Sequence, residues 1–289
     1  MYRLCFYILF INVFFMANVF AAEKIKVFVS ILPQKDFVKQ VGKDLVDIEV
    51  MVGPGQNPAT YEPTPKQMAH IAGATVYFSI GVPFENAWLP KIRKNNKRLI
   101  VVDCCDSLTE KMITSHHHAG LDEEISHNDP HVWTSPKKVI QLVEQITGQL
   151  ISIDNKHEAI YRESSNQFIK RLLDLDNEIR IKTRNLVKRE LIVSHPSWSY
   201  FAQEYNFIQI PIEQNGKEIQ ANALVRLIND ARRKNIKAVF IQPQFNNKAA
   251  EMIAKEIGAR LIMLDPLASD YITNMQQVTE KIVEGLSYE

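Results

Sequence analysis

Two histidines and one aspartate of this 289-residue chain stand where side chains could bind a metal ion. His131 lies just before an expected helix, whereas His195 and Asp265 each follow an expected strand directly. Ligands of open parallel sheets bind at the carboxyl ends of the strands. Imidazole and carboxylate groups are also ligands that zinc and related divalent ions accept. The pattern predicts a metal site of His131, His195 and Asp265 in a cleft.

Each of these residues also has a structural interpretation. A single histidine after a strand is often hydrogen-bonded without binding anything, and an Asp-Pro pair in that position is often a turn or a helix cap. Metal binding is favoured because the three side chains stand at segment ends in both halves of the chain.

A second histidine feature lies shortly before His131 in the sequence. It contains His116-His117-His118 and, further on, His127, with Asp122-Glu123-Glu124 between them. A polar loop with several imidazoles can bind metal weakly. The alternative is a solvated loop whose histidines have no role.

The elements that must position these residues alternate between short apolar runs and amphipathic segments, which is typical of β-α-β units. Strands are expected at residues 24–30, 46–52, 76–80, 99–102, 191–194, 207–210, 239–242 and 260–264. Helices are expected at residues 34–41, 84–93, 198–205, 222–234, 247–257 and 270–286, with two more starting at Thr64-Pro65 and Ser135-Pro136. Thr64 with Gln67 predicts a capping box, and Gly42 and Gly258 predict helix ends.

Residues 157–189 differ from this alternation, since they contain no Gly or Pro and read as one long helix. Their heptad repeat is not sustained, which favours a rigid connector over a coiled-coil arm. The expected fold is therefore α/β, with two lobes of mostly parallel sheet joined by one long rigid helix. The expected boundaries are an N-terminal lobe at 22–155, the connecting helix at 156–189 and a C-terminal lobe at 190–289.

The first 21 residues are expected to be a cleaved signal peptide. A short basic start precedes the apolar run Leu4–Phe20, and Val19-Phe20-Ala21 fits cleavage after Ala21. An uncleaved membrane anchor is the alternative, because the run approaches a spanning length. The formal net charge of +1 indicates no nucleic-acid partner.

Cleavage would leave Cys104 and Cys105 as the cysteines of the mature chain. Adjacent cysteines do not easily form a disulfide with each other, so no disulfide framework is expected. Two small buried residues after a strand are favoured over a Cys-Cys metal site.

Several segments, in order along nearly the whole mature chain, resemble the zinc- and manganese-binding solute-binding proteins of ABC importers. Two of them contain His131 and His195, and a third contains Asp265. The segments are Pro58-Ala59-Thr60-Tyr61-Glu62-Pro63-Thr64-Pro65, Asp129-Pro130-His131-Val132-Trp133, Ser194-His195-Pro196-Ser197-Trp198-Ser199-Tyr200-Phe201, Gln242-Pro243-Gln244-Phe245 and Leu264-Asp265-Pro266-Leu267. The resemblance implies two α/β lobes bridged by a long helix. It further implies a periplasmic, monomeric, non-enzymatic subunit that captures Zn²⁺, or else Mn²⁺ or Fe²⁺, for a membrane permease.

This chain departs from the family pattern at Ala59, where the family usually has a metal-binding histidine. The resemblance therefore extends to His131, His195 and Asp265 alone, and a fourth ligand could be water, Glu62, Glu213 or a substrate group. A three-ligand site with an open position is also the arrangement of catalytic zinc, so a secreted metal-dependent hydrolase is an alternative. Loss of metal binding, leaving an adhesin-like protein, is another.

Overall fold

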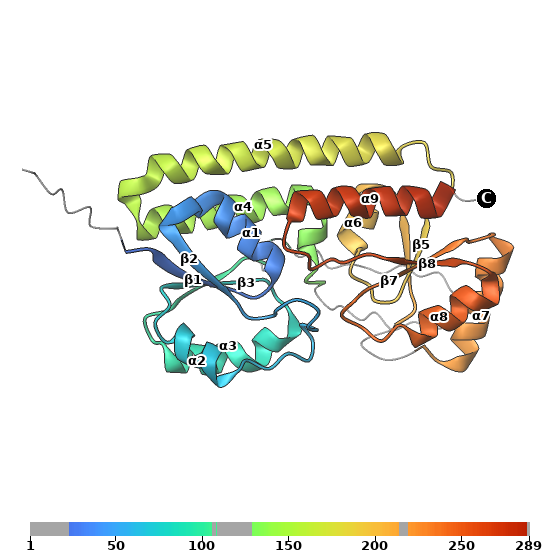
Figure 1. Cartoon of the computed structure of the whole chain (residues 1–289), viewed down its shortest axis with the longest axis horizontal. Helices are drawn as coiled ribbons and strands as arrows, with labels where there is room; N and C mark the ends of the chain where they lie inside the picture. The colour runs from blue at the N-terminus through green and yellow to red at the C-terminus, as the bar shows by residue number, and fades with distance from the viewer. Residues whose placement is uncertain (1–22, 106–107, 109–128, 214–218, 288–289) are drawn as a thin grey trace, which may run out of the picture.

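The computed structural model describes residues 23–105, 108, 129–213 and 219–287. Two α/β lobes lie side by side, and one long helix runs along both of them (Figure 1). The predicted signal peptide and the histidine-containing segment at 115–127 fall outside the described residues. Within the described part of the chain, no helix is long and apolar enough to cross a membrane.

The first lobe is built on a four-stranded parallel sheet with the strand order β2-β1-β3-β4. Its central strands are buried on both faces and rich in Val, Ile, Phe and Tyr, as expected for a parallel sheet covered by helices. Its elements are β1 (Ile25–Val29), α1 (Leu32–Gly42), η1 (Lys43–Leu45), β2 (Val46–Val50), α2 (Pro65–Ile71), β3 (Val76–Ser79), α3 (Pro83–Asn95), β4 (Ile100–Asp103), η2 (Val132–Thr134), α4 (Pro136–Ile153) and η3 (Asn155–His157).

The second lobe repeats this arrangement with the strand order β6-β5-β7-β8, again all parallel. Its elements are β5 (Glu190–Val193), α6 (Ser199–Glu204), β6 (Ile208–Pro211), α7 (Ala221–Arg233), β7 (Ala238–Ile241), α8 (Lys248–Ile257), β8 (Arg260–Met263) and α9 (Tyr271–Ser287). In both sheets the strand order reverses between the two central strands, and this reversal is where open α/β sheets bind ligands.

The connecting helix α5 (Glu158–Thr183) packs against α1 and α4 of the first lobe and against α9 of the second (Figure 1). It ends six residues before the predicted end at residue 189. After the helix the chain enters the second sheet, where the carbonyl of Arg189 accepts a hydrogen bond from Ile208 N (2.8 Å).

One hydrophobic core extends through both lobes. It includes Phe28 and Phe78 of the first sheet, Phe168 and Leu172 of α5, and Phe240 of the second sheet. A smaller core lies on the other face of the second sheet, between that sheet and the helices α7 and α8, where Ile192 and Val239 face inward. The two lobes are therefore joined by shared packing as well as by the chain.

Most predicted helix ends are confirmed. Thr64 and Gln67 form the predicted capping box of α2, Ser135 caps α4, and Gly258 ends α8 in the left-handed conformation. Gly42 is the last residue of α1, as predicted, but it does not adopt the left-handed conformation.

Gly42 is helical, and the following residue, Lys43, adopts the positive φ of 48° instead. A glycine is needed at position 42 for another reason. A Cβ atom there would come within 2.5 Å of Val46 Cγ1.

Candidate functional site

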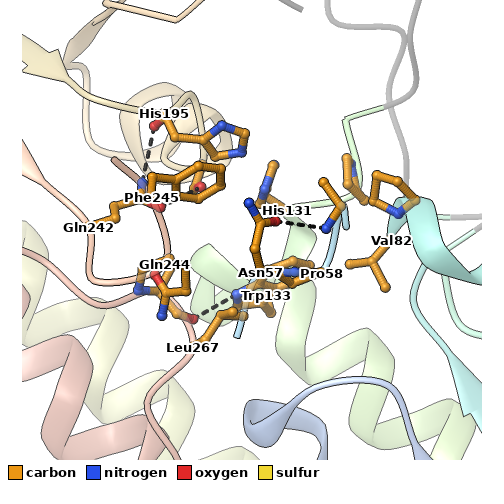
Figure 2. A pocket seen from close by; sticks show the side chains of 15 residues that line it. Asn57, Pro58, Val82, His131, Trp133, His195, Gln242, Gln244, Phe245 and Leu267 are labelled. Carbon is orange, nitrogen blue, oxygen red and sulfur yellow. Dashed lines mark hydrogen bonds between the residues drawn. The ribbon is translucent and has the colours of Figure 1, made fainter. Parts of the chain in front are cut away.

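A cavity of about 130 Å³ lies where the loops of the two lobes meet (Figure 2). Both lobes line it, from segments far apart in the sequence. The lining residues are Asn57, Pro58, Ala59, Val82, Pro83, Pro130, His131 and Trp133 from the first lobe, and His195, Ser197, Gln242, Gln244, Phe245, Pro266 and Leu267 from the second. We refer to it below as the interlobe pocket.

His131 precedes the short helix η2 and is held by its neighbour Asp129. The carboxylate oxygen Oδ1 of Asp129 accepts hydrogen bonds from His131 N (2.9 Å) and from His131 Nδ1 (2.6 Å). Because an ionised carboxylate can only accept, the neutral form of the ring carries its proton on Nδ1 and keeps the lone pair on Nε2. His131 therefore has the tautomer that a metal-binding histidine with a carboxylate partner has.

Asp129 is ionised in this arrangement. Burial raises the pKa of its carboxyl group, but the charge of His131 and hydrogen bonds from His131 and Ser199 outweigh burial and lower the pKa below its ordinary value. The Tyr200 hydroxyl, from the second lobe, donates to the Asp129 carbonyl at 3.0 Å. The turn that carries His131 is thus fixed from both lobes.

His195 follows β5 and has a carboxylate partner of its own. Its Nδ1 atom lies 3.0 Å from Glu213 Oε2, so its Nε2 atom is also left with a lone pair. The ring stacks on Phe245 at a centroid distance of 4.0 Å and an interplanar angle of 17°.

Burial lowers the pKa of His195 below its usual 6.5, although the hydrogen bond to Glu213 acts in the opposite direction. The charge of His131 lowers the pKa of His195 as well. His195 is therefore neutral at neutral pH, which is the form that binds a metal ion.

The structure brings the two predicted histidines together. Their ring centroids lie 5.4 Å apart with an interplanar angle of 73°, and both rings line the interlobe pocket (Figure 2). Two imidazoles, each with a carboxylate on Nδ1, form a pair of donors suited to a divalent transition metal such as zinc.

Asp265, the third predicted ligand, is not among the residues that line the pocket. Its Oδ1 atom accepts hydrogen bonds from Gln244 Nε2 (2.6 Å) and from Leu267 N (2.9 Å). The described residues contain no group of three or more His, Cys, Asp or Glu side chains that could hold a metal ion. The residues that follow Asp265, Pro266 and Leu267, line the pocket.

The departure at Ala59 faces the same pocket. Ala59 is one of the lining residues, and its backbone N–H donates to Asn57 Oδ1 at 2.8 Å. Of the two carboxylates considered as a fourth ligand, Glu62 is exposed and outside the lining, and Glu213 is the partner of His195 Nδ1. The third imidazole of the family pattern has no substitute at this position.

Cys104 and Cys105 are both buried free thiols, as predicted. Other residues of the site were missed as contributors. The roles of Asp129 and of the segment Gln242–Phe245 were not predicted, although both belong to the segments that carry the family resemblance. An Asp two residues before a candidate ligand was the available signal for Asp129, since a side chain at that spacing can turn back to its own chain.

Two parallel-sheet lobes, joined by a long helix and facing a pocket with paired histidines, define a metal-binding solute-binding protein. The chain belongs to the family described as zinc-uptake complex component A, periplasmic (ZnuA), whose model matches residues 27–285.

A curated relative and two solved structures that resemble this chain are also named ZnuA. The high-affinity zinc uptake system protein ZnuA of Bacillus subtilis (strain 168) is 30% identical over 253 residues, covering 85% of this chain and 79% of the relative. A crystal structure of ZnuA superimposes with a TM-score of 0.84 at 37% identity, and a zinc-bound deletion mutant of ZnuA with 0.85 at 36%. Each of these structures covers 92% of this chain and is itself covered completely.

Proteins of this family carry metal ions and are not enzymes, and the same holds for this chain. The family assignment removes the hydrolase alternative.

Proposed function

We propose that this protein captures a divalent transition metal, zinc foremost, in the interlobe pocket and delivers it to the membrane permease of an ABC importer. The ligands are His131 from the first lobe and His195 and Asp265 from the second. The ion then bridges the two lobes. Mn²⁺ and Fe²⁺ are the other ions that this set of nitrogen and oxygen donors accepts.

The observation that carries this proposal is the pair of histidine rings at 5.4 Å, each bonded through Nδ1 to a carboxylate. Hydrogen bonds of this kind orient metal-binding imidazoles and raise their basicity. The zinc bound to the similar ZnuA deletion mutant supports zinc as the cargo.

The proposed location follows from the sequence and the family. Residues 1–21 direct export and are removed, and the mature protein, residues 22–289, acts as a monomer in the periplasm. Its partners are the metal ion and the permease, with no role for nucleic acid. The zinc-uptake names of the family and of the Bacillus subtilis relative support an importer as the destination.

Calorimetric titration of chelator-treated mature protein with zinc and with manganese tests this function. We expect tight one-to-one zinc binding in the wild type and its loss in a His131→Ala, His195→Ala double variant that keeps the wild-type circular dichroism spectrum. A folded wild-type protein that binds neither ion would reject metal capture, and undiminished binding by the double variant would reject this pocket.

Delivery needs a test in cells. A strain that lacks the gene should grow poorly when zinc is chelated, and the wild-type gene should restore its growth. The double variant should fail to restore it. If the double variant restored growth, zinc import would not depend on the two histidines.

A further inference from the structure

The loop Gln242–Phe245 follows β7, the strand that lies between β5 and β8 in the second sheet. His195 follows β5 and Asp265 follows β8, so this loop has one proposed ligand on each side. Parallel strands end at the same edge of a sheet, which brings the three loops together. The topology therefore places Gln242–Phe245 within reach of both proposed ligands of the second lobe.

Three side chains of the loop contact His195 or Asp265. Gln242 Nε2 donates to the His195 carbonyl at 3.1 Å, and the Phe245 ring stacks on the His195 imidazole (Figure 2). Gln244 Nε2 donates to Asp265 Oδ1 at 2.6 Å. The loop itself is held by Asn247 Nδ2, which donates to the carbonyls of Gln242 and Phe245.

Gln244 bonds one oxygen of the Asp265 carboxylate and leaves the other available. Oδ1 accepts from Gln244 and from Leu267 N, whereas Oδ2 has no hydrogen bond to any described residue. A carboxylate anchored at one oxygen in this way can offer its second oxygen to a metal ion. Its side chain then loses little further conformational entropy when the ion binds.

The Gln244 side chain is incompletely satisfied as a packing residue. It is 8% exposed and lines the interlobe pocket, and its Oε1 atom is buried without a partner among the described residues. A buried acceptor without a hydrogen bond is unfavourable, and this one belongs to a residue that lines the pocket. The atom can accept a hydrogen bond from a water molecule bound to the metal.

We propose that Gln244, which lines the pocket, is a positioning residue of the metal site, and that it acts by holding the Asp265 carboxylate through Oδ1 so that Oδ2 is available to the ion. The inference rests on the proposed function, since it assumes that the pocket binds zinc. It assigns a role to a residue that does not itself coordinate the metal.

The test is a double-mutant cycle with Gln244→Met and Asp265→Ala, measured as zinc affinity by competition with a chromophoric chelator. Methionine keeps the length of the side chain and removes both amide atoms. We expect Gln244→Met to weaken zinc binding about 10- to 100-fold, the usual effect of losing a hydrogen bond to a metal ligand. In the Asp265→Ala background it should cause no further loss, a result that a merely structural role would not produce.

Gln276→Met is the matched control. Gln276 donates its Nε2 to the Glu178 carboxylate at 2.7 Å, but it lies on α9 and outside the pocket lining. Its replacement should leave zinc affinity unchanged. If Gln244→Met does not fold, Gln244→Asn replaces it in the cycle, because the shorter amide also loses contact with Asp265.

The outcomes separate the inference from the proposed function. Wild-type protein that binds no zinc would reject both. Wild-type binding together with undiminished or tighter binding by Gln244→Met would reject the inference alone. An equal loss in the Asp265→Ala background, or wild-type affinity in Asp265→Ala itself, would also reject it.

Discussion

At the scale of single residues, the pocket differs from the family pattern at Ala59. The two histidines present two lone pairs, and the position from which a third imidazole would come carries a methyl group that lines the same pocket. A zinc ion with fewer protein ligands holds more water molecules. We therefore expect Ala59 to lower zinc affinity and to ease release of the ion.

Replacing Ala59 by histidine should reverse this effect. An added imidazole at the pocket wall supplies a third nitrogen donor, and we expect zinc affinity to rise at least about tenfold, which corresponds to about 1.4 kcal/mol. Competition with a chromophoric chelator at pH 7.5 measures the change.

Ala59→Leu is the control for this prediction, because leucine adds bulk without a donor atom and should bring no gain in affinity. Equal affinities for the histidine and leucine variants would show that position 59 does not reach the ion.

At the scale of elements, the sequence predicted the order of strands and helices because short apolar runs and caps are local signals. Thr64, Ser135 and Gly258 mark their helix ends through contacts with near neighbours. Arg189 lies outside α5 and pairs with Ile208, and the need for glycine at position 42 comes from Val46. Such contacts depend on the tertiary fold, which local patterns do not report.

The same limit applies to the pocket. That His131 and His195 share one cleft could be predicted from their places at segment ends. The hydrogen bond from Gln244 to Asp265 joins two loops 21 residues apart, and no spacing rule predicts which oxygen it occupies.

The first turn of α3 contains a buried carboxylate that we expect to make the stability of the first lobe depend on pH. Glu85 is 3% exposed and accepts hydrogen bonds from Ser30 Oγ, Ile80 N and Gly81 N. Burial raises the pKa of Glu85 from 4.5 to about 7. Between these pH values the folded protein keeps a proton on Glu85 that the unfolded chain has released.

The folded state should therefore lose stability as the pH rises from about 4.5 through about 7. Each pKa unit corresponds to about 1.4 kcal/mol, so the effect of Glu85 is roughly 3 kcal/mol. Urea unfolding of the metal-free mature protein at pH 5 and pH 8 measures it. In Glu85→Gln this part of the pH dependence should disappear. A difference between pH 5 and pH 8 that is the same in both proteins would contradict the assignment to Glu85.

At the scale of the whole molecule, several contacts tie the lobes to each other beside the pocket. The Trp133 indole N–H donates to the Pro266 carbonyl at 2.9 Å, and Lys137 pairs with Glu204 at 2.6 Å. Further along, Tyr271 N donates to an Asp36 carboxylate oxygen at 3.1 Å. Together with α5, which is about 39 Å long, these contacts resist hinge motion.

Opening the lobes widely would expose part of the core that both share, at about 25 cal/mol for each Å² of apolar surface. Capture and release of the ion should therefore involve loops and side chains at the pocket while the lobes keep their relative position. We expect X-ray scattering of the mature protein to give the same radius of gyration with and without zinc, within the error of the measurement. The His131→Ala, His195→Ala variant is the control for zinc added without binding. A compaction on zinc addition in the wild type alone would show that the lobes close around the ion. The shared core would then have to pack differently in the metal-free and the zinc-bound protein.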